Sequence, residues 1–563
     1  MKNLYFIIII SFLSIGCASQ KNSEQNTSNE FKNGAVVTAH PLASKVGVDI
    51  LKKGGNAVDA AIAVKFALAV VYPNAGNIGG GGFMVYRGNN GEVASLDFRE
   101  KAPQAAFKDM YLDKDGNPIT DLSLYGQLAA GVPGAVAGMD AAHKKYGSLP
   151  WKDLVQPAIE LAANGFAITK QQAEEFNEYK PKFVELNPNG AAIIKNESWK
   201  TGDLFVQKEL ANTLKLIQEK GRDGFYKGKT ADLIVSEMKR GNGIISHEDL
   251  ANYEAIWRNP IVGSYKGYKV ISMPPPSSGG VALLALLQSV ENYPLKKWGF
   301  QSDSTIRAMV EAERRVYADR ATHLGDPDFY KVPVENLTDA KFNQARMAKV
   351  SLAKATPSDV VKATKFPGYE SEQTTHYSIV DKDGNAVSLT TTINGSYGAC
   401  VWVDGAGFLL NNEMDDFSVK PGTPNMYGLL GGKANAVEPG KRMLSAMTPT
   451  IIEKDGKLKM VVGTPGGSTI ITSVFQTILN VLEFDMTAQE SVSASRFHHQ
   501  WKPDRIDVEA KAVSSQIRES LQKDGYTIRQ RGNIGRVENI VILPNGKKQA
   551  GADHRGDDTA MGY

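Results

Sequence analysis

The apolar positions that open the globular part of the chain recur with the period of an α-helix. Residues 42–53 carry such a pattern, and Gly54 follows it as a helix C-cap. Asn56 is a good N-cap for a second helix over residues 57–70, and Asp59 stands at its third position, as in a capping box. The second helix is apolar almost all round, so we expect it to be buried.

Strands become the dominant pattern toward the end of the chain. Residues 131–351 are mostly helical in pattern with strands interspersed, whereas short alternating strands and glycine turns follow residue 374. Two of these strands, residues 375–380 and 386–393, flank a polar turn centred on Asp383 and form a predicted hairpin. The mixture predicts an α/β protein, and 563 residues suffice for several cores or one large unit.

The first 17 residues indicate a targeting segment that is separate from the fold. Lys2 precedes an apolar run over residues 4–15, which is too short to span a bilayer as a mature helix, and Cys17 follows a small glycine. This segment resembles a bacterial lipoprotein signal, in which the cysteine thiol is lipidated and becomes the new N-terminus. The alternative is a plain secretory signal cut near Ala18. Both predict export, and lipidation predicts a periplasmic or outer-membrane-associated protein.

Charge and cysteine usage exclude several classes of partner. Lys and Arg number 64 against 61 Asp and Glu, a net charge of +3 without a basic block, so nucleic acid is not expected. The polar residues 18–32 predict a flexible tether between membrane and globule. Only Cys17 and Cys400 occur, so a lipidated Cys17 leaves no intrachain disulfide, and Cys400 fits a small core residue. Neither HExxH nor CxxC is present, so no metal site is expected.

The peptide bond Gln373–Thr374 is the strongest candidate for chemistry. Cutting it would give Thr374 a hydroxyl and a free amine together, and such an amine titrates at roughly 7.7–8.0. The amine can then take the proton of the hydroxyl, so one residue supplies nucleophile and base. The predicted hairpin places Thr392 opposite Thr374, and a register error of one residue would substitute Thr391 or Ile393. Thr392 is therefore either a partner of the nucleophile or one residue of a strand rich in threonine for its β-propensity.

A glycine turn between a strand and a helix offers backbone N–H donors. The strand over residues 457–462 is followed by Gly466 and Gly467, and a helix begins at Ser468. This arrangement aims free N–H groups at one point, as the oxyanion of acyl transfer requires, and each such donor lowers the barrier by about 3–4 kcal/mol. A tight turn without a ligand is the alternative.

Two short charged segments are candidates for ligand binding. Glu413, Asp415 and Asp416 crowd one loop, where they disfavour each other's ionisation and would be relieved by a cationic ligand such as an ammonium. The alternative, and the commoner outcome, is a solvated acidic turn. Arg99 follows a predicted strand and offers a planar fork for a carboxylate, although pairing with an acidic neighbour is favoured from this segment alone.

Together these motifs resemble the gamma-glutamyltransferase (glutathione hydrolase) family of N-terminal-nucleophile enzymes. The run over residues 374–398 matches the family signature, and the likeness extends through PPPSSGG, LLNNEMDDFS, GTPGGS, SRFHHQW and the closing DDTAMGY. The resemblance implies a four-layer αββα sandwich formed by two subunits of one precursor, which cuts itself before the nucleophilic threonine. Here the cut falls at Gln373–Thr374, giving a large subunit over residues 33–373 and a small catalytic subunit over residues 374–563.

The resemblance also implies roles for individual residues. Thr392 matches the family's second threonine, and Gly466 with Gly467 match its oxyanion glycines. The residues that match groups around the substrate's α-carboxylate are Arg99 and Ser445, and those around its α-amino group are Asn394, Glu413 and Asp416.

Two further segments bear on substrate access and preference. Residues 421–440 match the lid of some members, and Tyr427 matches its gating tyrosine. The family usually has Ser-Ser-Met where this chain has Ser445-Ala446-Met447, so one hydroxyl facing the α-carboxylate is missing. The loss of a hydrogen bond to a charged group costs about 1.5–3 kcal/mol.

The resemblance therefore implies an exported, lipid-anchored enzyme that cleaves γ-glutamyl amides such as glutathione without a cofactor. The γ-glutamyl group passes from Thr374 to water or to an amino-acid or dipeptide acceptor. One alternative is an acylase of the same fold for glutaryl-type amides, which Ala446 favours and Asp416 opposes, because a glutaryl group has no amine. Another is a surface lipoprotein that binds peptides without catalysis, which the intact set of Thr374, Thr392 and the glycine pair opposes.

Overall fold

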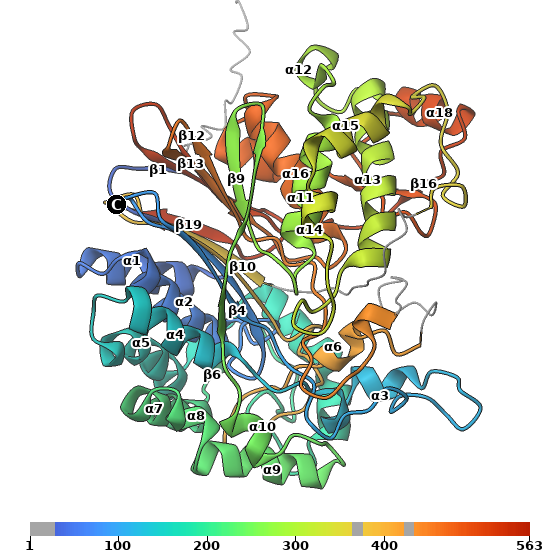
Figure 1. Ribbon diagram of the computed structural model, residues 1–563. Coiled ribbons are helices and arrows are strands. Elements are labelled where there is room, and N and C mark those ends of the chain that lie inside the picture. Colours follow the sequence, from blue (N-terminus) through green and yellow to red (C-terminus); the bar gives the residue numbers. More distant parts are fainter. Residues whose placement is uncertain (1–28, 363–374, 421–432) are drawn as a thin grey trace, which may run out of the picture.

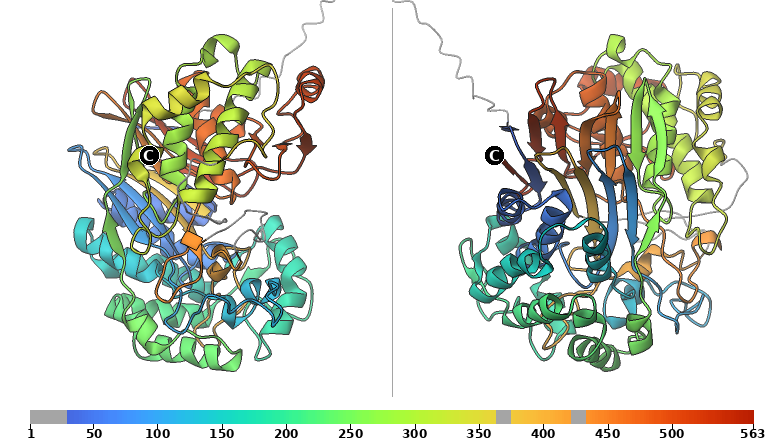
Figure 2. Two further views of the ribbon diagram at one scale, coloured as in Figure 1. Left: turned by 45° about the vertical axis from the view of Figure 1, so that its right-hand side comes forward. Right: turned by 60° about the vertical axis from the view of Figure 1, so that its left-hand side comes forward.

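Two antiparallel sheets form the centre of the computed structural model, which describes residues 29–362, 375–420 and 433–563. The strands of the first sheet, in spatial order, are β1 (Asn29–Phe31), β18 (Lys548–Ala552), β17 (Glu538–Ile542), β13 (Lys457–Gly463), β12 (Thr450–Lys454), β9 (Tyr268–Ser272) and β8 (Ile261–Tyr265). Those of the second sheet are β19 (Thr559–Gly562), β2 (Ala35–Thr38), β10 (Thr375–Val380), β11 (Ala386–Thr392), β3 (Gly81–Arg87), β4 (Val93–Phe98) and β7 (Ile256–Arg258). The two sheets face each other, with β10 and β11 packed on β13 (Figures 1 and 2).

Helices cover the outer face of each sheet. Those on the second sheet are α1 (Pro41–Lys52), α2 (Ala57–Val71) and α4 (Ala135–Tyr146), with α5 (Trp151–Asn164) and α7 (Lys208–Lys220) behind them. Those on the first sheet are α11 (Gly279–Val290), α16 (Thr469–Leu482) and α17 (Ala488–Ser493), with α13 (Asp303–His323) and α15 (Ala340–Ala348) against α11. The predicted four-layer αββα sandwich is confirmed (Figure 2).

Further α-helices and several short strands complete the described structure. The remaining helices are α3 (Thr120–Leu124), α6 (Lys170–Leu186), α8 (Asp223–Tyr226), α9 (Lys229–Arg240), α10 (His247–Ala251), α12 (Leu295–Trp298), α14 (Val334–Leu337) and α18 (Ser515–Lys523). The remaining strands are β5 (Phe166–Ala167), β6 (Leu204–Phe205), β14 (Phe497–His498), β15 (Ile506–Val508) and β16 (Ile528–Gln530).

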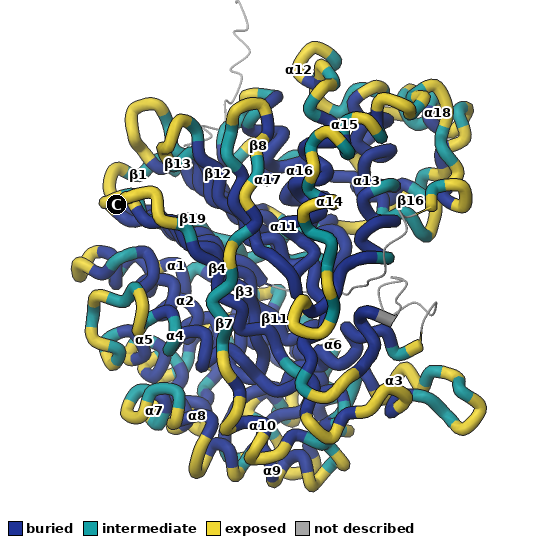
Figure 3. The backbone as a smooth tube through the Cα atoms, viewed as in Figure 1, coloured by how far each residue is buried: buried dark blue, intermediate teal, exposed yellow. Residues whose placement is uncertain are grey.

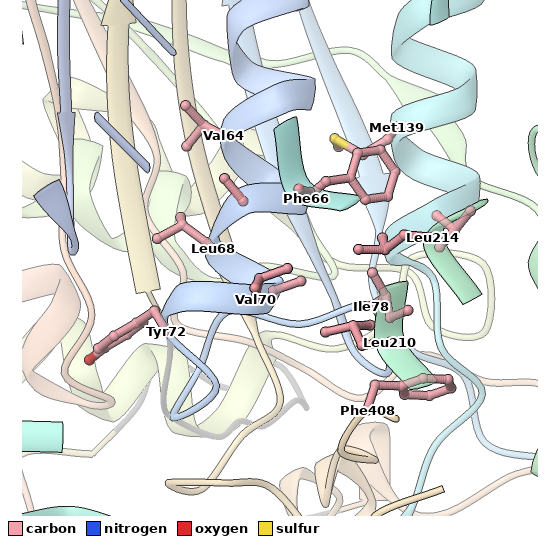
Figure 4. Packing of buried hydrophobic residues seen from close by; sticks show 14 of the residues in the cluster. Val64, Phe66, Leu68, Val70, Tyr72, Ile78, Met139, Leu210, Leu214 and Phe408 are labelled. Carbon is pink, nitrogen blue, oxygen red and sulfur yellow. The ribbon is translucent and has the colours of Figure 1, made fainter. Parts of the chain in front are cut away.

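Helix α2 shows how the sequence pattern builds the packed layer behind the second sheet. The Asn56 side chain accepts hydrogen bonds from the first turn, and the Asp59 carboxylate accepts one from the Asn56 N–H at 3.0 Å, so the predicted capping box is present. All 15 residues of α2 are buried, as predicted. Figure 4 shows part of this cluster, in which Phe66 of α2 lies near Met139 of α4 while Val64 points to the other side of α2.

A second hydrophobic cluster fills the space between the sheets and under α11 and α16. Strands β3, β10 and β11 are buried along their whole length, while exposed positions gather on the outer helices and loops (Figure 3). The polar groups between the sheets are therefore desolvated, and they need partners within the protein.

The register of the hairpin formed by β10 and β11 is confirmed over its described length. Thr375 lies opposite Thr391, and the pairing runs without a slip to Val380 opposite Ala386. This is the register expected for a turn centred on Asp383. Because side chains alternate between the faces of a sheet, the register fixes which threonines of β11 face the same side.

Residues 29–31 correct the predicted tether at its end. They form strand β1, which pairs with β18, and Phe31 packs against the second hydrophobic cluster. A tether over residues 18–32 is therefore wrong for these three, because Phe31 supplies an apolar anchor. Residues 18–28 and Cys17 lie outside the described residues. Within the described part, no helix has the length and apolar character needed to cross a membrane.

The chain around Cys400 is irregular rather than a strand. Tyr397, Gly398 and Cys400 have φ of +62°, +57° and +56°, values that interrupt an extended chain. Cys400 is buried and free, which confirms its prediction as a small core residue.

Candidate active site

Thr392, the predicted partner of the nucleophile, ends β11 and is fully buried. Its hydroxyl oxygen accepts a hydrogen bond from the Asn394 N–H at 2.7 Å, and the hydroxyl also bonds to the Glu413 carboxyl. These contacts join the end of the strand to the acidic loop, a role that β-propensity alone does not require. Gln373 and Thr374 lie outside the described residues, so the cut and the pairing of Thr374 with Thr392 stay predictions.

Gly466 and Gly467 form a turn between β13, which ends at Gly463, and α16, whose N-cap is Ser468. Their φ values of +134° and +65° favour glycine. The Gly466 carbonyl accepts hydrogen bonds from the N–H and the hydroxyl of Thr469, at 3.2 and 2.6 Å, so it turns into the helix. No described residue accepts a hydrogen bond from the N–H of either glycine. Both donors thus suit an oxyanion, and the predicted strand, turn and helix start are confirmed.

His376 packs the strand that follows the candidate nucleophile against the base of this turn. A Cβ at Gly463 would lie 2.3 Å from the His376 ring, so only glycine allows the two strands to approach this closely. The ring nitrogens bond to Thr390 Oγ1 at 2.9 Å and Ser378 Oγ at 3.0 Å. Burial lowers the pKa of His376 to about 3, so its ring is neutral and acts as a fixed spacer.

Arg99 lies at the centre of a buried charge cluster. Its guanidinium pairs with Glu413 at 2.7 Å and with Asp416, and it lies 3.4 Å from Glu100. None of these four residues is more than 2% exposed. The solvated acidic turn is therefore wrong, because Arg99 lets the loop fold inward. Asp415 takes a different direction and accepts a hydrogen bond from Ser123 at 2.7 Å.

Three carboxyl groups around one guanidinium leave this cluster short of positive charge. Burial, with the charge of Glu413, raises the pKa of Asp416 and of Glu100 well above the usual range, and burial raises the pKa of Glu413. Burial acts to lower the pKa of Arg99, but its carboxylate neighbours outweigh burial and raise it, so the guanidinium stays charged. A ligand ammonium would supply the missing positive charge.

The remaining residues predicted to hold the substrate lie beside Arg99. Its Nε and one terminal nitrogen donate to the carbonyls of Met443 and Leu444, at 3.2 and 3.3 Å, directly before Ser445. Asn394 contributes a buried Oδ1 that has no hydrogen-bond partner among the described residues, and the buried carboxyl of Asp416 shares a hydrogen bond with that of Glu413.

Three of the predicted residues are in direct contact, namely Arg99, Glu413 and Asp416. Asn394 is linked to them through Thr392, and Ser445 is next in the chain to the Leu444 carbonyl that Arg99 binds. Ala446 is 1% exposed and belongs to the second hydrophobic cluster. Tyr427 and residues 421–432 of the predicted lid lie outside the described residues.

Two residues near Arg99 and Thr392 were not predicted as part of the site. Glu100 is adjacent to Arg99 in the chain, and Lys65 is fully buried in α2. The Lys65 ammonium donates to the Asn77 carbonyl, and the Asn77 amide donates to the Thr392 carbonyl at 2.8 Å. Burial lowers the pKa of Lys65 to about 7, against the opposing pull of Glu100. One feature of the sequence indicates the special position of Lys65: it is a single lysine in the otherwise apolar second half of α2.

Two facing sheets between helical layers, with the strand after the candidate cut in the middle of one sheet, are the architecture of the N-terminal-nucleophile hydrolases. The chain belongs to the gamma-glutamyltranspeptidase family, whose model matches residues 43–563. The predicted family is therefore confirmed.

The chain is similar in sequence to known relatives over nearly its whole length. The chain is 48% identical over 535 residues to a glutathione hydrolase proenzyme of Escherichia coli, covering 94% of this chain and 92% of the relative. It is 46% identical over 557 residues to a glutathione hydrolase proenzyme of Pseudomonas aeruginosa, covering 98% of each. The crystal structure of a cephalosporin acylase from Bacillus halodurans matches with a TM-score of 0.84 at 26% identity, covering 99% of both chains.

Proposed function

We propose that this protein is an exported, self-cleaved enzyme that hydrolyses γ-glutamyl amide bonds, as in glutathione. It passes the γ-glutamyl group to water or to an amino-acid or dipeptide acceptor. The cut at Gln373–Thr374 gives a large subunit that ends at Gln373 and a small subunit of residues 374–563, which remain together as a heterodimer. One observation carries the proposal: a guanidinium and several carboxyl groups share one buried site beside Thr392, and an α-amino acid brings the complementary carboxylate and ammonium.

The chemistry proceeds through an ester on Thr374. The Thr374 hydroxyl attacks the γ-carbonyl carbon while its own amine takes the proton, and the carbonyl oxygen becomes an oxyanion that the Gly466 and Gly467 N–H groups bind. Collapse of this intermediate expels the leaving amine, which takes up a proton. Water or an acceptor amine then attacks the ester and frees Thr374. These steps need no cofactor, and nucleic acid has no part in them.

Substrate recognition rests on exchanging ion pairs within the cluster. The α-carboxylate takes the place of a carboxylate partner on Arg99, with Ser445 as a second donor. The α-ammonium pairs with the carboxylates of Asp416 and Glu413, and Asn394 Oδ1 is a further acceptor. The Asn394 Oδ1, which has no donor among the described residues, supports this assignment, since a buried acceptor without a donor is costly. Tyr427, on the lid over residues 421–440, is proposed to gate entry.

A glutaryl-type amidase is the second candidate function. Ala446 favours it, because the missing hydroxyl weakens recognition of an α-carboxylate. The acidic cluster opposes it, because a glutaryl group offers no ammonium to Asp416 and Glu413. The higher identity to glutathione hydrolase proenzymes than to the acylase of known structure also supports the γ-glutamyl assignment.

The rates on γ-glutamyl and glutaryl anilides decide between the two functions. We expect kcat/KM to favour the γ-glutamyl anilide by up to roughly 10⁴-fold, because the glutaryl group leaves buried carboxylates unpaired.

The raised pKa of Asp416 and Glu413 means that a proton stays on the cluster until the pH rises. Raising the pH removes this proton and creates the charge that pairs with the ammonium. The preference for the γ-glutamyl anilide should therefore grow with pH, and a preference for the glutaryl anilide would establish the acylase.

Export and anchoring are proposed from the first 32 residues. The apolar run before Cys17 supports a lipoprotein signal, and a lipid on Cys17 would be the only contact with the membrane. Mass spectrometry of the large subunit from its native host should show an N-terminus at Cys17 that carries acyl chains. The variant Cys17→Ala should lack this mass increment and leave the membrane fraction. A mature N-terminus near Ala18 without a lipid would support the plain secretory signal.

A further inference from the structure

The segment Ser495–Trp501, SRFHHQW in sequence, has no part in the site described so far, yet it reaches the glycine turn. His498 lies on β14 and is 1% exposed. Its Nε2 is 2.8 Å from Gln500 Oε1 and 3.2 Å from Ser468 Oγ, and the Ser468 hydroxyl donates to the same Gln500 oxygen at 2.6 Å. Ser468 directly follows Gly466 and Gly467 and is the N-cap of α16.

A second contact holds the backbone of the same serine. The hydroxyl of Tyr317, on α13, donates to the Ser468 carbonyl, and the Tyr317 ring meets the His498 ring edge to face with centroids 5.7 Å apart. Helix α11 packs against both α13 and α16, and Tyr317 reaches across to the start of α16. Both the side chain and the carbonyl of Ser468 are therefore fixed from outside its own helix.

The imidazole has one consistent hydrogen-bonding state. Since Gln500 Oε1 accepts, His498 Nε2 carries the proton, and Nδ1 accepts from the Thr472 hydroxyl at 2.8 Å. Burial lowers the pKa of His498 to about 3, so the ring stays neutral throughout the range in which the Thr374 amine would titrate. Gln476 of α16 clamps the backbone of β14 at Phe497, with bonds of 2.6 and 3.2 Å, so the ring cannot shift independently of the helix.

We propose that His498, together with Gln500 and Tyr317, is a positioning group that holds the oxyanion turn in its working orientation. The inference rests on the proposed function, because it assumes that the Gly466 and Gly467 N–H groups bind the oxyanion. The turn needs such support: both glycines have positive φ, and glycine gives up more conformational freedom on ordering than any other residue. A rigid serine at the helix start limits the remaining motion of the two N–H vectors.

The neighbouring histidine shows that this role belongs to one face of the segment. The His499 N–H donates to Glu313 at 3.0 Å, and its Nε2 lies 3.3 Å from Asp504, away from Ser468. An extended chain sends alternate side chains to opposite sides, so His498 and Gln500 face the turn while His499 does not.

The proposal predicts a loss of turnover without a loss of substrate affinity. His498→Leu keeps the apolar contacts but removes the polar contacts of both ring nitrogens, and kcat for γ-glutamyl p-nitroanilide should fall about 10- to 100-fold. KM should stay within about threefold, because the ring does not touch the substrate groups near Arg99. His498→Gln places an amide N–H where Nε2 was and should recover a large part of kcat. The pH profile of kcat should keep its shape, since the ring does not titrate in this range.

The second variant tests the same positioning of Ser468 with a smaller change. Tyr317→Phe deletes one hydroxyl and should lower kcat about fivefold or more at unchanged KM. Its matched control is Tyr226→Phe, which deletes an equally buried hydroxyl that donates to the Pro133 carbonyl at 2.8 Å, and which should leave kcat unchanged. Self-cleavage and thermal unfolding are followed for every variant, and Tyr317→Phe decides the question if His498→Leu fails to fold.

The outcomes separate this inference from the proposed function. A wild-type protein that leaves the anilide intact overturns the proposed function and this inference with it. An active wild type with undiminished kcat in folded His498→Leu, or in Tyr317→Phe, overturns this inference alone. A shifted pH profile in His498→Gln would also overturn it, because it would make the ring a titrating acid or base.

Discussion

The variant Thr374→Ala is expected to remain a single uncut chain without detectable turnover of γ-glutamyl p-nitroanilide. The hydroxyl and the amine of one residue supply the nucleophile and the base, so removing Oγ1 stops the attack on the substrate. It also removes the group proposed to attack its own preceding peptide bond, so maturation fails with catalysis. A denaturing gel reports the cut, and released p-nitroaniline reports turnover.

Thr374→Ser is the matched control for this variant, because it retains a hydroxyl and, after the cut, an N-terminal amine. It should mature and keep measurable activity. A Thr374→Ala chain that still cuts itself and still releases glutamate would refute the mechanism. A wild-type chain that stays uncut as one band would instead favour the peptide-binding lipoprotein without catalysis.

Elements defined by neighbouring residues could be predicted from the sequence. The capping box of Asn56 and Asp59 needs only three residues of spacing, and the burial of α2 follows from an apolar pattern with no polar face. The hairpin register depends on one turn, and the structure shows the expected pairing from Thr375 to Val380. The glycine turn before α16 could be predicted for the same reason, because it depends only on neighbouring residues. In each case the physical cause lies within about twenty residues of chain.

Contacts between distant segments could not be predicted in the same way. The sequence shows acidic residues at Glu413 and Asp416 and a basic one at Arg99, but not that β4 delivers Arg99 into the acidic loop. Without that contact the loop would be solvated, as such turns commonly are. Lys65 is a similar case, because its link to Thr392 through Asn77 exists only once α2 packs on the second sheet. Long-range packing decides the chemistry of these groups.

Asp415 and Asp416 illustrate the same limit at adjacent positions. Residue type and spacing do not rank them, and only the family resemblance singles out Asp416; both are 2% exposed. The 3-10 turn Glu413–Asp416 sends Asp415 toward Ser123 and Asp416 toward Arg99. Substitutions at these two adjacent positions therefore affect different hydrogen-bond and ion-pair partners.

Asp416→Asn should lower kcat/KM for γ-glutamyl p-nitroanilide about 30- to 1000-fold, which corresponds to about 2–4 kcal/mol for truncating one partner of a buried charge pair. The amide keeps the shape of the carboxyl but cannot balance the substrate ammonium, so the loss should appear mainly in KM. A glutaryl anilide carries no ammonium, so its kcat/KM should change little and the preference for the γ-glutamyl substrate should collapse. Asp415→Asn is the control, because its carboxyl faces Ser123, and it should retain both rates within a few fold. Equal losses on both anilides in Asp416→Asn would mean that Asp416 only supports Arg99, and ammonium recognition would then have to rest on Glu413 and Asn394.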